Sequence, residues 1–217
     1  MTLQSSIWNS TDSEELMRKY IGRRYINLEE ISEAKKAEAK YIADYLNLSS
    51  NSTVIDLGPG LGLIASNLAP LVKHLYCVDI SKSFLRESIK HLKEHNNISF
   101  ELIEYGNLSK FSDIDSVYCL AVFIHFNIYD ISIYLEEIYH VLKNNGTVLF
   151  DYYDVDFFNN LDETFIRHKA LYKQDQAIRT NINFNSTTAI LNICESLGYK
   201  TEIKRAGPHP LVLARKA

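Results

Sequence analysis

The sequence is poor in cysteine, proline and tryptophan, and its 217 residues include only three cysteines, Cys77, Cys119 and Cys194. The three lie far apart in apolar surroundings, and no pair has the spacing of metal ligands. We therefore expect buried, reduced thiols rather than disulfides or a zinc site. The histidines and acidic residues show no arrangement at the expected strand ends that we would assign to a metal, so the sequence predicts none.

Long apolar runs are also missing. The segment from Cys119 to Ile124 is among the longest, and a membrane-spanning helix needs about 20 apolar residues. Residues 1–10 lack a basic segment followed by an apolar stretch, so we expect a cytoplasmic protein with no membrane partner. The net charge of −4, without an evident basic patch, disfavours nucleic acid as a partner. A homodimer stays open.

The sequence contains a regular alternation of strand and helix patterns after an N-terminal helical segment. A helix from about Leu28 places apolar residues near one face, namely Ile31, Ala34, Ala37, Ala39, Ile42 and Leu46. Five strands are expected at 53–57, 74–79, 98–103, 116–122 and 147–152, with helices at 63–71, 81–95 and 128–142. Repeated βα units of this length require parallel pairing, which predicts an α/β doubly wound sheet.

We interpret the whole chain, residues 1–217, as a single domain. It comprises an N-terminal helical lid at 1–48, a core at 53–152, a helical insert at 154–185 covering the substrate, and a C-terminal part at 186–217. That last part contains a helix at 187–197 and two strands, 199–204 and 210–215. The turn Gly207-Pro208-His209-Pro210 between these strands predicts an antiparallel hairpin at one edge of the sheet.

The strongest local signal is the segment Asp56-Leu57-Gly58-Pro59-Gly60-Leu61-Gly62. It follows a strand, and we expect a helix to begin near Gly62, which is the setting of a ligand-binding glycine loop. Glycines allow positive φ angles and a close approach of the ligand to the main chain. The amino end of the helix would add unpaired amide groups and a positive dipole.

Two kinds of ligand fit a glycine loop in this position. A nicotinamide dinucleotide is one, because residues 60–65 also fit the pattern G-x-G-x-x-A. Asp56 argues against it, since a carboxylate would repel a diphosphate but attract the ammonium of a methionyl group. Asp79 ends the second strand, where a carboxylate can accept hydrogen bonds from both ribose hydroxyls in either ligand.

The segment from about Val54 to Phe150 resembles the class I S-adenosylmethionine (SAM)-dependent methyltransferases that act on small molecules. Residues 54–62 resemble the first motif of that family, and Val78-Asp79-Ile80-Ser81 resembles the end of its second strand. Residues 141–147 resemble the turn before its fifth strand. The resemblance implies a seven-stranded sheet of order 3-2-1-4-5-7-6 with the last strand antiparallel, and SAM as cofactor. It further implies a cofactor site made from Asp56, Gly58, Pro59, Gly60, Gly62, Asp79, Ile80, Asn107, Leu108 and Ala121. The family often has Gly-Asp where this chain has Gly106-Asn107; asparagine can still accept a hydrogen bond from adenine there.

Residues after the fourth and fifth strands are candidates for the chemistry. His125 is the expected catalytic base, because its ordinary pKa of about 6.5 suits proton transfer, although a packing or capping role is also open. Asp151 is expected to orient His125 or to bind the acceptor. Tyr152 and Tyr153, with Tyr20 and Arg24 from the N-terminal segment, are the expected substrate-binding residues, and simple packing is the alternative for each.

Together these patterns predict SAM-dependent methyl transfer to a small polar acceptor, with a hydroxyl of a sugar or secondary metabolite favoured over an amine. The choice of oxygen rests on His125 and on a chain rich in tyrosine, with 14 residues of that type. An NAD(P)-dependent oxidoreductase and a non-catalytic SAM-binding module are the two alternatives that the sequence leaves open.

Overall fold

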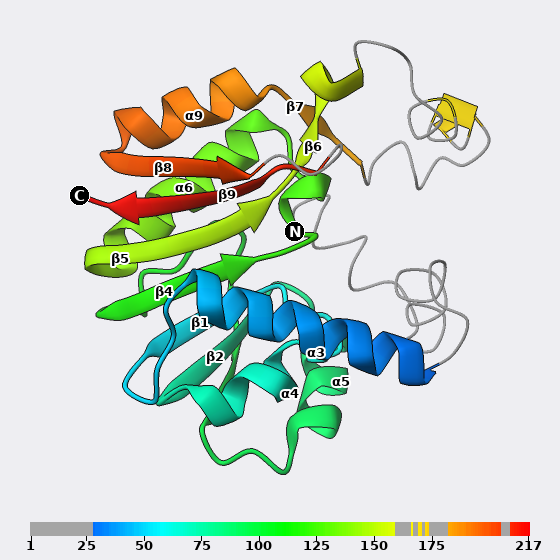
Figure 1. Cartoon of the computed structure of the whole chain (residues 1–217), viewed down its shortest axis with the longest axis vertical. Coiled ribbons are helices and arrows are strands. Elements are labelled where there is room, and N and C mark those ends of the chain that lie inside the picture. The colour runs from blue at the N-terminus through cyan, green and yellow to red at the C-terminus, as the bar shows by residue number, and fades with distance from the viewer. Residues whose placement is uncertain (1–27, 159–165, 167–168, 171, 174–181, 205–208) are drawn as a thin grey trace. The chain divides into compact units, whose positions relative to one another are not determined.

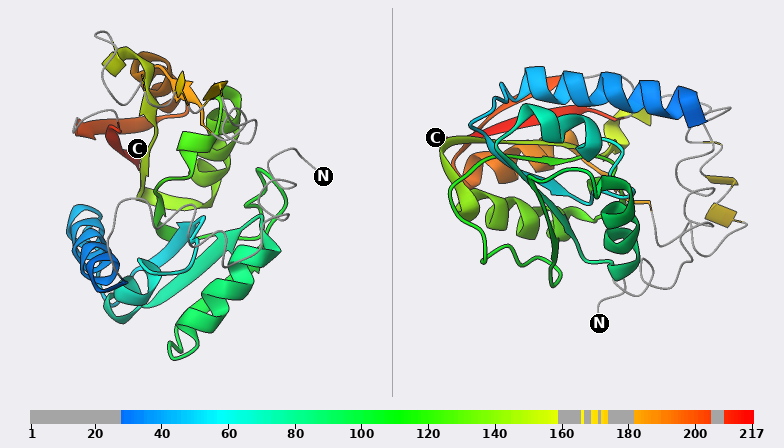
Figure 2. Two further views of the ribbon diagram at one scale, coloured as in Figure 1. Left: turned by 90° about the vertical axis from the view of Figure 1, so that its right-hand side faces the viewer. Right: turned by 90° about the horizontal axis from the view of Figure 1, so that it is seen from below.

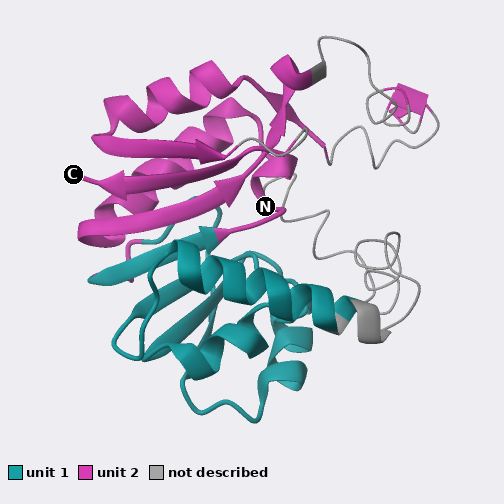
Figure 3. Cartoon of the chain, viewed as in Figure 1, with its two compact units in different colours: residues 1–108, 113–118 teal, residues 109–112, 119–217 magenta. Residues whose placement is uncertain are grey.

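The computed structural model in Figure 1 describes residues 28–158, 166, 169–170, 172–173, 182–204 and 209–217. The first 27 residues of the expected N-terminal lid, with Tyr20 and Arg24, lie outside these residues, as does most of the 154–185 insert. The described part of the chain divides into two compact units, shown in two colours in Figure 3. The prediction that the chain is a single domain stays a prediction.

The first unit, residues 1–108 and 113–118, contains parallel strands. They are β1 (Thr53–Leu57), β2 (His74–Asp79), β3 (Ile98–Leu102) and β4 (Ile114–Cys119), whose last residue belongs to the other unit. β1 pairs with both β2 and β4, and β2 also pairs with β3. Every residue of β1 after Thr53 is buried, as expected for a central parallel strand covered on both faces.

The helices described in the first unit are α3 (Leu28–Tyr45), α4 (Ala65–Leu68), the short 3-10 helix η2 (Ala69–Leu71) and α5 (Lys82–Leu92). α3 packs against α4, and α4 packs against α5, which the views in Figure 2 allow the reader to follow. α5 begins where the sequence predicts, because the Ser81 hydroxyl accepts a hydrogen bond from the Phe84 amide at 3.3 Å.

The second unit, residues 109–112 and 119–217, contains a different set of elements. In chain order they are η3 (Phe123–His125), α6 (Ile128–Val141), β5 (Leu142–Asp151), β6 (Tyr153–Asp154), η4 (Val155–Phe158), β7 (Phe184–Asn185), α9 (Thr187–Ser196), β8 (Tyr199–Lys204) and β9 (Leu211–Lys216). β9 pairs antiparallel with both β5 and β8, which confirms the expected hairpin. β6 and β7 form a separate small parallel pair.

The strand order is β3-β2-β1-β4-β5-β9-β8. This confirms the predicted order, since the additional short strands β6 and β7 only raise the numbers of the last two. In this topology the carboxyl ends of the parallel strands carry the loops that bind ligands.

Several element boundaries differ from those predicted. The helix after the glycine loop begins at Ala65 instead of Leu63, and α4 itself has only four residues, so the expected helix amino end beside Gly62 is wrong. β5 begins at Leu142, because residues 143–146 continue the strand instead of forming a separate turn. The sequence analysis places Ala37 on the apolar face of α3, but Ala37 is exposed, and Ala43 is buried.

Candidate active site

The first part of the candidate site is a buried carboxyl group near the end of β1. Asp56 is only 3% exposed, and its register partners are Cys77 on β2 and Tyr118 on β4. Residues paired in register on parallel strands have side chains on the same face of the sheet. Both Asp56 Oδ2 and the hydroxyl oxygen of Tyr118 are buried without a hydrogen-bond partner among the described residues. Such groups are rare in proteins, and they point to a missing partner.

Burial raises the pKa of Asp56 to about 7, because a carboxylate loses its hydration in this position. The nearby Tyr118 hydroxyl lowers this pKa, and the acidic groups of Asp79 and Glu38 raise it further. Lys35, which forms a 2.6 Å ion pair with Glu38 on α3, lowers it slightly. A group that titrates near neutral pH can be brought into its charged form by a cation placed beside it.

The glycine loop is fixed by bonds to neighbouring elements. The Gly58 amide donates to the Val78 carbonyl at 2.8 Å, and the Gly60 carbonyl accepts a bond from the buried Ser88 hydroxyl at 2.7 Å. Gly60 has a φ of +58° and open space where a Cβ would be, whereas a Cβ at Gly62 (φ +78°) would come within 2.6 Å of Leu92. Gly62 is therefore needed for packing, and Gly60 leaves its main chain open to a ligand.

Asp79 lies at the end of β2, the strand next to β1, and also has a raised pKa of about 7. Burial is the main cause, and the amides of Ser81 and Ile80 oppose it by stabilising the carboxylate. The Ser81 amide donates to Asp79 Oδ1 at 2.8 Å. This bond holds the carboxyl group at the start of α5, as a ribose-binding acid requires.

The other cofactor candidates of the first unit differ in accessibility. Ile80 is half-buried, and Asn107 is exposed after Gly106, whose φ is +67°. Leu108 is completely buried, so contact with an adenine ring would require this side chain to move. Pro59 is half-buried within the glycine loop.

In the second unit, Asp151 at the end of β5 holds the turn that follows β4. Its Oδ1 accepts a 2.7 Å hydrogen bond from the Ala121 amide, and Ala121 has the left-handed φ of +57° that non-glycine residues rarely adopt. The sequence predicts β4 as far as Val122, but this turn ends the strand at Cys119. The sequence-based expectation that Asp151 orients His125 or binds the acceptor stays a prediction.

His125 ends η3 and is half-buried. Two asparagines, which the sequence analysis missed, bind this turn. Asn183 donates its amide to the Ile124 carbonyl and its side-chain Nδ2 to the His125 carbonyl, both at 2.8 Å. Asn185 Nδ2 donates to the Phe126 carbonyl at 2.9 Å. No motif marks these asparagines, because they act on a segment almost 60 positions earlier in the chain.

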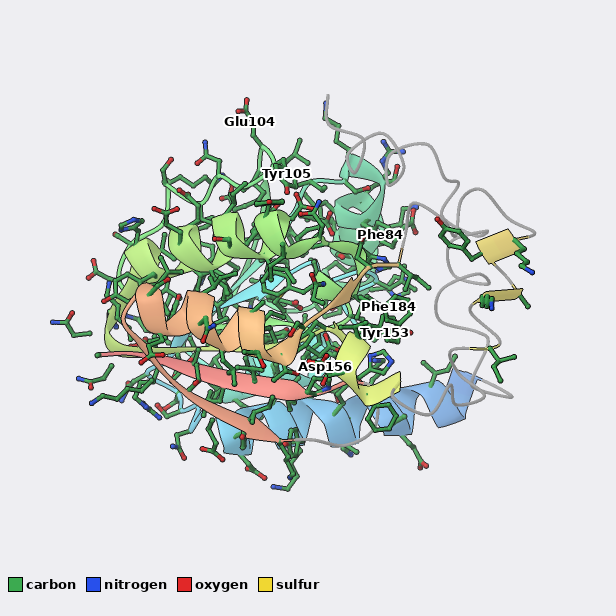
Figure 4. The ribbon with its side chains drawn as sticks, turned by 90° about the horizontal axis from the view of Figure 1, so that it is seen from above. Phe84, Glu104, Tyr105, Tyr153, Asp156 and Phe184 are labelled. Carbon is green, nitrogen blue, oxygen red and sulfur yellow. The ribbon has the colours of Figure 1, made fainter. Side chains whose placement is uncertain are left out.

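The two tyrosines after β5 are placed differently. Tyr152 is completely buried, and its hydroxyl makes a 2.7 Å hydrogen bond with the Thr187 hydroxyl, which in turn donates to Asp154. This network packs Tyr152 in the core, as the packing alternative expects, and its contact with the substrate stays a prediction. Tyr153 instead packs on Phe184 and His209, with ring centroids 5.3 and 4.0 Å apart, and Figure 4 shows it beside Phe184.

Tyr20 and Arg24, the remaining predicted substrate-binding residues, lie outside the described residues. Within the described ranges, no three histidine, cysteine or acidic side chains are grouped as a metal site would require. No helix in the described part of the chain combines the length and the apolar character needed to cross a bilayer.

The comparisons with known proteins agree on one class. Residues 55–150 match the family model described as a methyltransferase domain. A segment of 153 residues is 28% identical to a glycine/sarcosine/dimethylglycine N-methyltransferase from Actinopolyspora halophila, covering 66% of this chain and 25% of that protein. A segment of 93 residues is 32% identical to a putative methyltransferase of Invertebrate iridescent virus 6, covering 41% and 34%. The chain thus spans only about a quarter to a third of the length of these curated relatives.

Among solved structures, the magnesium protoporphyrin IX methyltransferase of Synechocystis PCC 6803 with bound S-adenosylhomocysteine (SAH) has the same fold. The TM-score is 0.73 at 17% identity, with 99% of both chains covered. The structure of that enzyme with bound SAM gives a TM-score of 0.69 at 17% identity, over 99% of this chain and 96% of that one.

The sheet order and the glycine loop define an α/β protein of the Rossmann-like methyltransferase class. Residues 55–150 therefore form a domain of the class I SAM-dependent methyltransferase type. The family assignment decides against the oxidoreductase alternative.

Proposed function

We propose that this chain transfers the methyl group of SAM to a small polar acceptor, and that the acceptor atom is a hydroxyl oxygen. The cofactor part rests on the buried Asp56 carboxyl group at the base of the glycine loop, whose Oδ2 has no hydrogen-bond partner among the described residues. An ammonium group would supply that partner, and SAM carries one on its methionyl part. The unobstructed main chain at Gly60 is consistent with a ligand lying against the loop.

The residues of the first unit fit the remaining parts of SAM. Asp79 would accept hydrogen bonds from the ribose hydroxyls, and the exposed Asn107 would accept one from the adenine amino group. When bound, SAM supplies a methyl group on a sulfonium, which is an excellent leaving group. The protein then has to align the acceptor and, for an alcohol, remove its proton.

The acceptor side of the proposal rests on His125 as general base. Its main chain is held by Asn183, and the turn before it is held at Ala121 by Asp151. In this proposal Asp151 acts as a positioning residue, because its observed bond goes to the Ala121 amide. Tyr153, whose ring packs on Phe184 and His209, would contact the acceptor.

An amine is the second candidate acceptor. The halophilic relative is named for methylating glycine, sarcosine and dimethylglycine on nitrogen. An amine acceptor needs a base only to keep it unprotonated, so it would depend less on His125 in alkaline solution. The size of the activity loss when the His125 side chain is removed, measured in alkaline solution, therefore helps to distinguish an alcohol acceptor from an amine acceptor.

The cofactor part of the proposal is tested by calorimetry with SAM, SAH and NAD. We expect SAM and SAH to bind with dissociation constants on the order of micromolar, or about −8 kcal/mol. Asp79→Ala should weaken binding at least tenfold, because hydrogen bonds to a charged group contribute about 1.5–3 kcal/mol. Binding of NAD without binding of SAH would contradict the proposal.

The acceptor part is tested by incubating the protein with SAM and a panel of hydroxylated metabolites and amines, with SAH formation and product mass as readouts. His125→Ala should lower kcat about 100-fold or more for an alcohol while SAH still binds. His140→Ala is the matched control, since His140 is exposed in the last turn of α6. Methylation of amines alone would refute the choice of oxygen, and SAH binding without any turnover on the panel would favour a non-catalytic module.

A further inference from the structure

The buried hydroxyl of Tyr118 lies near Asp56, and neither the sequence motifs nor the family match gives it a role. Tyr118 is 1% exposed and sits in register with Asp56 on the adjacent strand β4. Its oxygen and Asp56 Oδ2 are the two buried side-chain atoms left without hydrogen-bond partners in the described part of the chain. Two such atoms side by side suggest that they act together.

We propose that Tyr118 is a positioning residue that stabilises the charged form of the Asp56 carboxyl group, and that binding of the cofactor's amino-acid part is thereby coupled to release of a proton from Asp56. The inference rests on the proposed function, because the cation that draws Asp56 into its charged form is the ammonium of SAM or SAH.

The charges around Asp56 support this coupling. In the free protein the pKa of Asp56 is about 7, so the group is mostly protonated below neutral pH. The neighbouring strand β2 contributes Asp79 and the buried thiol of Cys77, and helix α3 contributes the Lys35–Glu38 ion pair. Asp79 and Glu38 disfavour the charged form of Asp56, and Lys35 only partly opposes them. Tyr118 is the strongest influence in favour of the carboxylate.

The tyrosine itself remains neutral. Burial, together with the Asp56 carboxylate, raises the pKa of Tyr118 well above its ordinary value. A neutral phenol next to a carboxylate is a hydrogen-bond donor, and such a bond favours the charged form of the acid. Tyr118 therefore sets the pH range in which Asp56 can hold a cation.

Proton release on binding is measured by calorimetry of SAH in buffers of different ionisation enthalpy, between about pH 5.5 and pH 8. With a group of pKa about 7, wild-type affinity for SAH should fall at least about tenfold per pH unit below neutrality. Asp79 titrates in the same range, so 5′-methylthioadenosine, which lacks the amino-acid part, is the control ligand. The number of protons released on binding SAH, minus the number released on binding 5′-methylthioadenosine, is the contribution of Asp56.

Tyr118→Phe removes the hydroxyl alone. Loss of the hydroxyl that would stabilise the Asp56 carboxylate should weaken SAH binding about tenfold at pH 6 but only about twofold at pH 8, because a much larger share of the free variant is ionised at pH 8. On binding SAH near pH 7, the variant should also release more protons than the wild-type protein does. Tyr76→Phe on β2, a half-buried tyrosine of the same unit, is the control and should change neither quantity.

An equal loss of affinity at every pH, with an unchanged proton count, would overturn the inference and make Tyr118 a purely structural residue. If Tyr118→Phe fails to fold, Asp56→Asn provides the second test. The number of protons that this variant releases on binding SAH should fall to the number released on binding 5′-methylthioadenosine. An unchanged number would contradict the proposal. SAH binding that does not depend on pH refutes the proton coupling alone. Absence of SAH binding at any pH refutes the proposed function itself.

Discussion

Asp56 shows how a single residue can be costly for folding and useful for binding. Its carboxyl group is buried, Oδ2 has no partner in the part of the chain that the structure describes, and its pKa rises from 3.8 to about 7 on folding. The folded state therefore holds a proton that the unfolded chain releases between about pH 4 and pH 7. The stability associated with this proton is complete below about pH 4 and is lost as the pH rises to about 7.

We expect Asp56→Asn to stabilise the ligand-free protein at pH 8, because the amide has the same shape and no charge to bury. The gain should be a few kcal/mol, or roughly 5–10 °C in Tm for a chain of this size, and should shrink toward pH 5. Thermal unfolding followed by circular dichroism measures it, with the exposed Asp44→Asn on α3 as control. A variant less stable than wild type at pH 8 would show that Asp56 has a structural partner.

At the scale of elements, the turn from Ala121 to Phe126 depends on residues distant in the chain. Its amino end is fixed at Ala121 by Asp151 from β5. Its carboxyl end is fixed by Asn183 and by Asn185, the last residue of β7. Three main-chain groups of one short turn are thus bound by side chains from two other segments, which restricts where His125 can lie.

Asn185→Ala should destabilise the protein by about 1–3 kcal/mol, because it leaves the Phe126 carbonyl, a main-chain acceptor of a buried residue, without its donor. Urea unfolding monitored by fluorescence measures the change. Asn144→Ala, at an exposed position of β5, should alter stability by less than about 0.5 kcal/mol. Equal effects of the two substitutions would argue that the Asn185 bond contributes nothing.

At the scale of the whole molecule, a ligand that binds only the folded chain should stabilise it by mass action. At a concentration of SAH about 100 times its dissociation constant, the gain is about 2.7 kcal/mol. This corresponds to a rise in Tm of roughly 5–10 °C for a chain of this length.

Differential scanning calorimetry with SAH, and with NAD as the comparison ligand, measures this rise. NAD should leave the Tm unchanged, since its diphosphate would face the Asp56 carboxyl group. A shift with NAD that equals the shift with SAH would contradict the cofactor assignment. Because the chain has a net charge of −4, non-specific electrostatic attraction gives neither ligand a reason to bind.

Much of the fold was predictable from the sequence, because local chemistry determines it. Short β-branched strands, helices with an identifiable cap such as Ser81, and the glycine loop after Thr53–Leu57 each depend on neighbouring residues. Their alternation requires parallel pairing, and the resemblance supplied the order of strands that the structure confirms. The positions of Asp56 and Asp79 at strand ends were predictable for the same reason.

The contacts that shape the candidate site came only from the tertiary structure. Tyr118 lies beside Asp56, Asp151 binds the Ala121 amide, and Asn183 binds the turn of His125, although each pair is at least 30 positions apart in the chain. Likewise, burial turned Tyr152 into a core residue and moved the pKa of Asp56 into the neutral range. The sequence determines which groups are present and on which element; hydration and long-range packing, which exist only in the folded chain, decide what those groups can do.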